Sequence, residues 1–244
     1  MKNLIIILFL VLLCLSLLIF TNWRVRDKVT QFQYDWQHKN ELVYTKAEVD
    51  KILKGIEKIS FSDLDNEYLQ FTKSNEKKYK KLIRKLTYYK VKREDLNKRI
   101  AGRFRLKEFI SKDKYYKDCI LGKEKEVICI FNPKIFYKTI ELLDELENLA
   151  YDKQAFEIVN GHRHPSYNEE VGGASLSRHI KGEAVDIVVN DINKDGYIDK
   201  SDKDIILDLL ENKIIRNEGG IGLYPGTRNV HYDVRGTRAR WNSY

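Results

Sequence analysis

Three residues in the C-terminal half have the types and spacing of ligands to a catalytic metal ion. His179 precedes a turn at Gly182, and Asp186 lies in residues 183–189, whose β-branched content predicts a strand. A turn followed by a strand brings His179 back beside Asp186. His231 lies in a second predicted strand, and two imidazoles with one carboxylate can hold a catalytic zinc ion and leave a fourth position open. Each feature alone also fits a structural role, but together they predict a zinc site.

The second predicted strand, residues 229–234, adds a further carboxylate. Side chains alternate along a strand, so His231 and Asp233 share one face. The apolar Val230 and Tyr232 share the other face and are expected to pack inward. Asp233 is therefore expected to lie on the same side of the sheet as the predicted ligand His231.

Several motifs surround these residues in order along the chain. They are Gly161-x-Arg163-x-Pro165-x-x-Asn168, Val171-Gly172-Gly173-Ala174, His179-x-x-Gly182-x-Ala184-x-Asp186, Gly220-Ile221-Gly222-x-Tyr224-Pro225-Gly226 and His231-x-Asp233-x-Arg235-Gly236. This set resembles the zinc peptidase family M15, which contains D-Ala-D-Ala carboxypeptidases and peptidoglycan-cleaving endopeptidases. The resemblance covers about residues 101–244. It implies a zinc-dependent peptidase that acts on peptidoglycan peptide stems.

The resemblance also implies catalytic roles for residues near the metal. Arg163 matches an arginine that holds a substrate carboxylate, which a planar guanidinium can grip with two hydrogen bonds. Ser177 matches a polar position near the substrate. A carboxylate is expected to accept a proton in this chemistry, and in much of the family it lies three residues before the last histidine. Arg228 occupies that position here and cannot act as a base, so Asp233 is predicted to replace it.

The rest of the chain divides by composition. Residues 101–244 are predicted to form an α+β catalytic domain with a small, mostly antiparallel sheet. Residues 24–100 carry no catalytic signature, and the stretch 72–105 contains 14 Lys or Arg against 3 Asp or Glu, which predicts a basic helical stalk. Residues 1–23 are predicted to form a transmembrane anchor or signal-anchor. Residues 4–20 are almost wholly apolar, and no small-x-small cleavage site follows them.

The predicted anchor makes the membrane a partner. The side of the membrane on which the C-terminal domain is expected follows from its substrate. Arg24, Arg26 and Lys28 follow the apolar stretch, which by the positive-inside rule weakly favours the cytoplasm for the following domain. A peptidoglycan substrate requires the opposite, so we expect an extracytoplasmic domain, in the periplasm or at the cell surface. The net charge of +8 favours anionic surroundings such as cell-wall polymer. No basic motif interleaved with aromatic residues predicts nucleic-acid binding.

Residues 191–202 match the pattern of an EF-hand calcium loop and resemble the dockerin type. The predicted calcium ligands are Asp191, Asn193, Asp195, Tyr197 through its backbone carbonyl, Asp199 and Asp202. Gly196 takes the position where such a loop turns sharply. The final Asp is shorter than the usual Glu, which predicts weaker binding. An acidic turn without calcium is the alternative, and bound calcium is expected to stiffen the segment between the zinc ligands.

Several alternatives remain open from the sequence. Cys119 and Cys129 flank a predicted turn and form either a disulfide or buried free thiols. His162 and His164 are expected to be exposed loop residues without a catalytic role. The predicted activity is that of a D-Ala-D-Ala carboxypeptidase, with a peptidoglycan endopeptidase or lytic enzyme as the second choice. Because Arg228 replaces the usual acid, a catalytically silent, zinc-containing cell-wall-binding module is the third.

Overall fold

The C-terminal half of the chain is built on a five-stranded sheet, in a computed structural model that describes residues 2–39 and 41–242. The strand order is β10-β8-β9-β7-β6. The bounds are β6 Phe156–Asn160, β7 Ala184–Val189, β8 Gly220–Gly222, β9 Asn229–Asp233 and β10 Ala239–Trp241. The β10–β8 pair is parallel and the other pairs are antiparallel. This confirms the predicted α+β class with a small, mostly antiparallel sheet.

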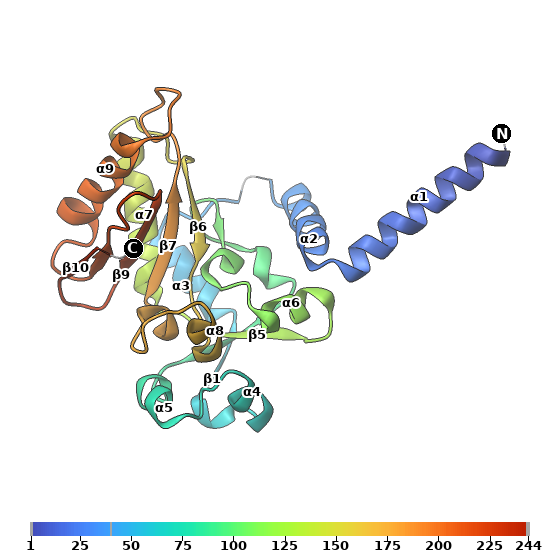
Figure 1. Ribbon diagram of the computed structural model, residues 1–244, viewed down its shortest axis with the longest axis horizontal. Coiled ribbons are helices and arrows are strands. Elements are labelled where there is room, and N and C mark those ends of the chain that lie inside the picture. Colours follow the sequence, from blue (N-terminus) through green and yellow to red (C-terminus); the bar gives the residue numbers. More distant parts are fainter. Residues whose placement is uncertain (1, 40, 243–244) are drawn as a thin grey trace.

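Helix α7 (Pro133–Asn148) packs against the sheet and closes the main core (Figure 1). The helix begins at Pro133, and the Asn132 side chain accepts a hydrogen bond from the backbone of Lys134, which caps the first turn. The Thr139 and Tyr232 hydroxyls, both buried, lie 2.8 Å apart and join α7 to β9. Tyr232 and Val230 therefore face the helix, and His231 faces the opposite side of the sheet.

The remaining helices flank this layer and a second, smaller one. They are α3 Lys46–Lys54, α4 Asn66–Phe71, α5 Lys77–Ile83, α6 Lys114–Leu121, α8 Pro165–Glu170 and α9 Lys200–Leu209, with the short helices η1 Phe61–Asp63, η2 Asp95–Asn97, η3 Leu106–Phe109, η4 Arg178–Lys181 and η5 Leu210–Ile214. The second layer holds the antiparallel sheet β1-β2-β5, with β1 Glu57–Ile59, β2 Tyr88–Lys92 and β5 Glu126–Ile130. Strands β3 Arg99–Ala101 and β4 Phe104–Arg105 form a separate two-stranded ribbon.

The expectation of a basic helical stalk before residue 101 is wrong for residues 46–100. This segment contains α3, α4, α5 and three strands, and β2 pairs with β5 from beyond residue 101. The cations that predicted a solvated helix are in part ion-paired across the fold, as in the contacts of Lys73 and Lys78 with Glu169 on α8 at 2.6 and 2.7 Å. The local structure is therefore determined by the burial of apolar side chains such as Tyr79 and Ile83, and not by the excess of positive charge.

Two helices precede this body. Helix α1 (Lys2–Thr21) extends away from the rest of the molecule, and α2 (Trp23–Gln37) lies against the body (Figure 1). Across the residues that the structure describes, no single helix is both long and apolar enough to cross a membrane. The span Ile6–Thr21 meets that criterion only together with α2, from which it is bent by 97°.

Cys119 and Cys129 are both buried free thiols. Of the two alternatives that the sequence left open, the structure therefore has the reduced pair.

Candidate metal centre

The centre is a row of residues that crosses the five-stranded sheet at one level. The register places Asp186 opposite His231, His231 opposite Gly222, and Asp186 opposite Asn160 on its other side. Directly opposite residues project from the same face of a sheet. Hydrogen bonding within the sheet therefore fixes the separation of Asp186 and His231, although they are far apart in sequence.

The third candidate ligand reaches this row from a short helix. Ser177 accepts a hydrogen bond from the backbone N–H of His179 at 3.3 Å and so caps η4. Gly182 ends η4 with a φ of +62°, and a Cβ there would lie 2.0 Å from the Ile130 carbonyl oxygen, so the turn requires glycine. The turn directs the chain from His179 into β7, which carries Asp186. Ser177 thus supports His179 directly, although the resemblance implied that it lies near the substrate.

Three ligand atoms converge at the centre. His179 Nε2, His231 Nδ1 and Asp186 Oδ1 form a triangle with sides of 3.2 Å between the two nitrogens, 3.1 Å from His179 to Asp186 and 2.9 Å from His231 to Asp186. Ligands at ~2.0–2.1 Å from a tetrahedral zinc ion are roughly 3.3 Å apart. The triangle therefore fits zinc with little movement, and within the described residues it is the group of His, Cys, Asp and Glu side chains that can hold a metal.

The outward nitrogen of each histidine has its own hydrogen-bond partner. His179 Nδ1 donates to the Gly161 carbonyl at 2.7 Å, and His231 Nε2 donates to Asp233 Oδ2 at 3.3 Å. Each bond fixes the proton on the outer nitrogen and leaves the lone pair of the inner nitrogen for the centre. Metal-binding histidines in proteins are held in this way by carbonyls and carboxylates.

The electrostatics of the centre favour a bound cation. Burial raises the pKa of Asp186, but the charges and hydrogen bonds of His179 and His231 outweigh burial and hold this pKa well below its ordinary value. Burial lowers the pKa of His179, although the neighbouring Asp186 acts in the opposite direction. Burial also lowers the pKa of His231, but Asp186 and Asp233 raise it by more. The two carboxylates thus attract one positive charge, either a proton or a metal ion.

Asp233 does not lie where a proton acceptor must be. It is fully buried, it accepts hydrogen bonds from Gly220 N at 3.0 Å and Arg235 Nε at 2.8 Å, and it contacts the side of His231 that faces away from the centre. Arg235 and His231 also keep the pKa of Asp233 well below its ordinary value, against the effect of burial. The expectation that Asp233 is the general base is therefore wrong, because the His231 ring stands between its carboxylate and the centre.

Arg163 is also engaged differently from the expectation. Its Nη2 donates to Asp186 Oδ2 at 2.5 Å, and its Nε is buried without a hydrogen-bond partner in the described structure. The guanidinium thus supports a candidate ligand and retains one unused donor beside the centre. Arg228, at the position of the usual family acid, donates to Asn190 at 2.8 Å in an exposed contact.

The two histidines expected to be exposed are both buried, which corrects that prediction. His164 Nδ1 lies 2.6 Å from Asp113 Oδ2, and its Nε2 lies 3.0 Å from the Ile128 carbonyl oxygen. Burial lowers the pKa of His164, but the charge and hydrogen bond of Asp113 raise it above the ordinary value. His162 packs edge-on against His164 with ring centres 5.1 Å apart. These contacts belong to the core between the two layers.

Two aromatic residues at the centre were present in the motifs but received no role from the sequence. The Trp241 ring lies 5.1 Å from the His231 ring, and it occupies space that only a glycine at position 222 leaves open, since a Cβ there would lie 2.9 Å from the indole. Burial and the negative charge of Asp186 raise the pKa of Tyr224, a partly buried residue. The Gly220-x-Gly222 spacing before Tyr224 was the feature of the sequence that could have indicated close packing of an aromatic side chain here.

The predicted calcium loop is folded without a converged set of ligands. Gly196 has a φ of +89°, as the sharp turn requires. Asp191 Oδ1 accepts from Asp195 N at 3.1 Å. Asp202, the predicted last ligand, is buried and accepts hydrogen bonds from the backbone of Ile192, Asn193 and Asp199 at 2.7, 3.2 and 2.9 Å. The carboxylate of Asp202 thus closes the loop as a structural cap.

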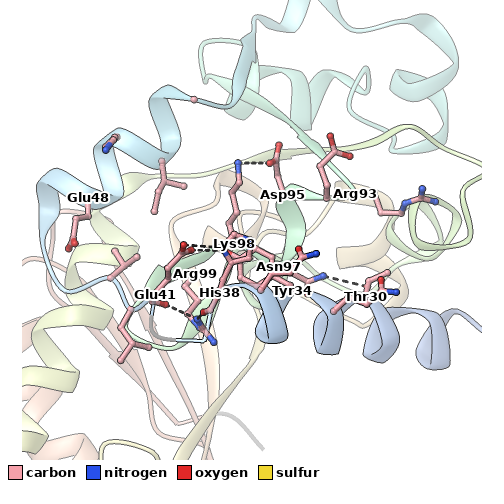
Figure 2. A pocket seen from close by; sticks show the side chains of 18 residues that line it. Thr30, Tyr34, His38, Glu41, Glu48, Arg93, Asp95, Asn97, Lys98 and Arg99 are labelled. Atoms are coloured by element: carbon pink, nitrogen blue, oxygen red, sulfur yellow. Dashed lines mark hydrogen bonds and ion pairs between the residues drawn. The ribbon is translucent and has the colours of Figure 1, made fainter.

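A groove lies elsewhere, between α2, α3 and residues 93–99, with a volume of about 1160 Å³ (Figure 2). None of its lining residues belongs to the metal centre. The groove is therefore separate from the candidate metal site.

Two histidines and one aspartate whose ligand atoms converge on one point form a ligand set typical of catalytic zinc sites. The family model of peptidase M15 matches residues 104–232, and the chain belongs to this family. Membership makes the protein a metallopeptidase of a family that is typically zinc-dependent. No curated protein and no solved structure shows significant similarity to the chain.

Proposed function

We propose that the protein is a zinc peptidase that hydrolyses peptide bonds in bacterial peptidoglycan stems. The observation that carries the proposal is the triangle of His179 Nε2, Asp186 Oδ1 and His231 Nδ1, with each imidazole proton held on the outer nitrogen. His179, Asp186 and His231 are the proposed zinc ligands. When bound, zinc supplies Lewis acidity and activates water near neutral pH.

Side chains around the metal site are proposed to orient the substrate and to donate a proton. The guanidinium of Arg163, which contacts Asp186 at 2.5 Å, is the cation beside the centre that suits a carbonyl or carboxylate oxygen of the substrate. The raised pKa of Tyr224, caused by burial and by Asp186, keeps its phenol protonated at neutral pH. A protonated phenol there can donate to the leaving amine or to the oxygen on which charge develops. Trp241 packs on His231 and limits the access of water from that side.

Two choices of scissile bond remain within this function. A D-Ala-D-Ala carboxypeptidase must grip the terminal carboxylate, and Arg163 was the predicted grip. One N–H of its Nη2 is engaged by Asp186, which restricts how the guanidinium can turn toward a terminal carboxylate. This contact favours the second candidate, an endopeptidase that cuts within stems or cross-links.

Digestion of purified peptidoglycan, followed by mass analysis of the products, separates these choices. Released D-Ala identifies a carboxypeptidase, and cleaved stems or cross-links identify an endopeptidase. Binding to peptidoglycan without any product, by a zinc-loaded protein, would contradict the enzymatic proposal and support a silent cell-wall-binding module.

We also propose that residues 1–23 anchor the protein in a membrane and hold the rest outside the cytoplasm. The apolar sequence of α1 and the cell-wall substrate support this arrangement. Protease treatment of intact spheroplasts tests it. Cleavage of the C-terminal domain is expected, and full protection until the cells are lysed would contradict it.

Calcium binding by residues 191–202 is a further proposal from the loop pattern. With Asp202 occupied as a cap, the ligands would be Asp191, Asn193, Asp195, Asp199 and the carbonyl of Tyr197. Calcium is expected to raise the melting temperature of the parent and not that of Asp195→Ala. An unchanged melting temperature of the parent in millimolar calcium would exclude the site.

A further inference from the structure

Helix α2 contacts the body through its polar side. Asp27 Oδ1 lies 2.8 Å from Lys107 Nζ, and Asp35 Oδ1 lies 2.9 Å from Arg99 Nη2 and 2.8 Å from Arg105 Nη2. Of the five residues in these contacts, four have largely buried side chains and Asp35 is partly exposed. Ion pairs at both ends of α2 thus fix its rotation about its own axis.

Figure 2 shows the same polar character where α2 ends. Arg99 Nη1 donates to the carbonyl oxygens of His38 and Glu41 at 2.7 and 2.8 Å, and the His38 ring lies 2.9 Å from the Glu41 carboxylate. Asn97 donates to Thr30 at 3.4 Å. The side of α2 that faces the body is therefore held by hydrogen bonds and ion pairs, together with Trp23, whose ring packs edge-on against the buried Tyr116 with ring centres 6.2 Å apart.

The outward side of α2 is apolar. Val25, Val29, Phe32 and Trp36 follow one another at steps of four, three and four residues, which aligns them on one helical face. Phe32 and Trp36 are each 68% exposed, and their rings lie 6.4 Å apart. A helix on a water-soluble surface buries its apolar face and exposes its polar face. On α2 only Trp23 packs on the core, Val25 and Val29 are partly buried, and the rings of Phe32 and Trp36 are directed outward without a partner within the described chain.

Positive charges border this apolar stripe. Arg24 and Lys28 are exposed on its flank, and Lys39 Nζ lies 4.7 Å from the centre of the Trp36 ring. Acidic residues of α2, Asp27 and Asp35, are directed to the body instead. An aromatic stripe with a cationic border is complementary to a bilayer surface that carries anionic headgroups.

The direction of α1 agrees with this partner. The two helices meet at 97°, and α1 leaves α2 on the side away from the body (Figure 1). If α1 runs along the membrane normal, α2 therefore lies in the plane of the membrane with its outward face toward the lipid.

We propose that α2 is an in-plane membrane helix whose Val25–Val29–Phe32–Trp36 stripe inserts among anionic phospholipid headgroups. The polar side of α2, through Asp27 and Asp35, then holds the body at a fixed tilt to the bilayer. The inference rests on the proposed anchor and is independent of the catalytic proposal, because it makes no use of the metal centre.

Nitroxide labels on the full chain test the proposal in vesicles that contain phosphatidylglycerol. Cys14 is replaced by Ser, and the buried Cys119 and Cys129 do not react in the folded protein. Single labels follow from Phe32→Cys and Trp36→Cys, and Leu149→Cys, on an exposed site of the body, is the matched control. Collision with oxygen, which partitions into lipid, is compared with collision with a water-soluble nickel chelate.

The proposal predicts a several-fold higher ratio of oxygen to nickel collisions at positions 32 and 36 than at position 149. Equal ratios at all three positions would show that the stripe faces water and would overturn the proposal. Labels at 32 and 36 shielded from both reagents would also overturn it, since that result identifies a second copy of the chain as the partner. Peptidoglycan digestion is unaffected by either outcome, so failure here is distinct from failure of the catalytic proposal.

Discussion

Asp233 lies behind His231, with its Oδ2 at 3.3 Å from the imidazole nitrogen that faces away from the metal centre. The same carboxylate is bound by Arg235 and by the backbone of Gly220, where a Cβ would lie 2.3 Å from Oδ2. This arrangement makes Asp233 a positioning residue for a ligand.

Asp233→Asn is therefore expected to weaken zinc binding, by about 10–100-fold, as is typical for partners of metal ligands. The physical reason is that an amide no longer fixes the His231 tautomer with a negative charge. Competition with a chelator measures the affinity, and Glu67→Gln, an exposed acid on α4, is the control. Unchanged zinc affinity together with a large loss of turnover would instead restore Asp233 as a proton acceptor.

Tyr224→Phe is expected to reduce kcat by about 10²-fold, the size of the contribution from one well-placed proton donor. Zinc content should not change, because the phenol is no ligand in the triangle formed by the other three side chains. Steady-state kinetics on a stem peptide provide the measurement. Tyr197→Phe, a strongly exposed tyrosine, is the control. A normal kcat in Tyr224→Phe would remove the residue from the chemistry.

The buried pair of Asp113 and His164 predicts a pH-dependent stability. The pKa of His164 is raised above its ordinary 6.5, so its contribution is complete below pH 6.5 and is lost as the pH rises through the folded value. The pKa of Asp113 is lowered below its ordinary 3.8, so its contribution is present above pH 3.8 and is lost in acid. The pair should thus stabilise the fold most between these limits.

Asp113→Asn is expected to lower the free energy of unfolding by about 3 kcal/mol at mildly acidic pH, because it leaves a buried imidazolium unpaired. The difference from the parent should shrink at alkaline pH, where His164 is neutral in both proteins. Urea unfolding at several pH values measures both. Glu124→Gln, an exposed acid, is the control. A pH-independent difference would mean that the pair contributes packing and not charge.

The sequence predicted the candidate ligands because their geometry is local or follows strand alternation. The turn at Gly182 and the alternation in β7 and β9 are readable from residue types, and the register that sets Asp186 opposite His231 then brings the three side chains together. The role of Asp233 could not be predicted in this way. Strand alternation predicts on which face of the sheet a side chain lies. It does not predict the rotamer of His231, which decides which nitrogen of the imidazole the Asp233 carboxylate contacts.

The region before residue 101 shows a different limit. A count of 14 cations against 3 acids in residues 72–105 predicts a solvated helix only if the cations have no partners. Their partners are distant in sequence, such as Glu169 for Lys73 and Asp35 for Arg105. The alternation in Tyr88–Lys92 was a local signal for the strand that forms there, and pairing with β5 stabilises it.

The central claim is that His179, Asp186 and His231 together hold one zinc ion. The most direct measurement is the zinc content of the purified full chain after dialysis, by plasma mass spectrometry, for the parent and for His179→Ala, Asp186→Ala and His231→Ala. We expect about one zinc per parent chain and almost none in each variant, with circular dichroism unchanged. A folded parent that binds no zinc from zinc-supplemented buffer, or variants that retain zinc fully, would rule out this zinc site.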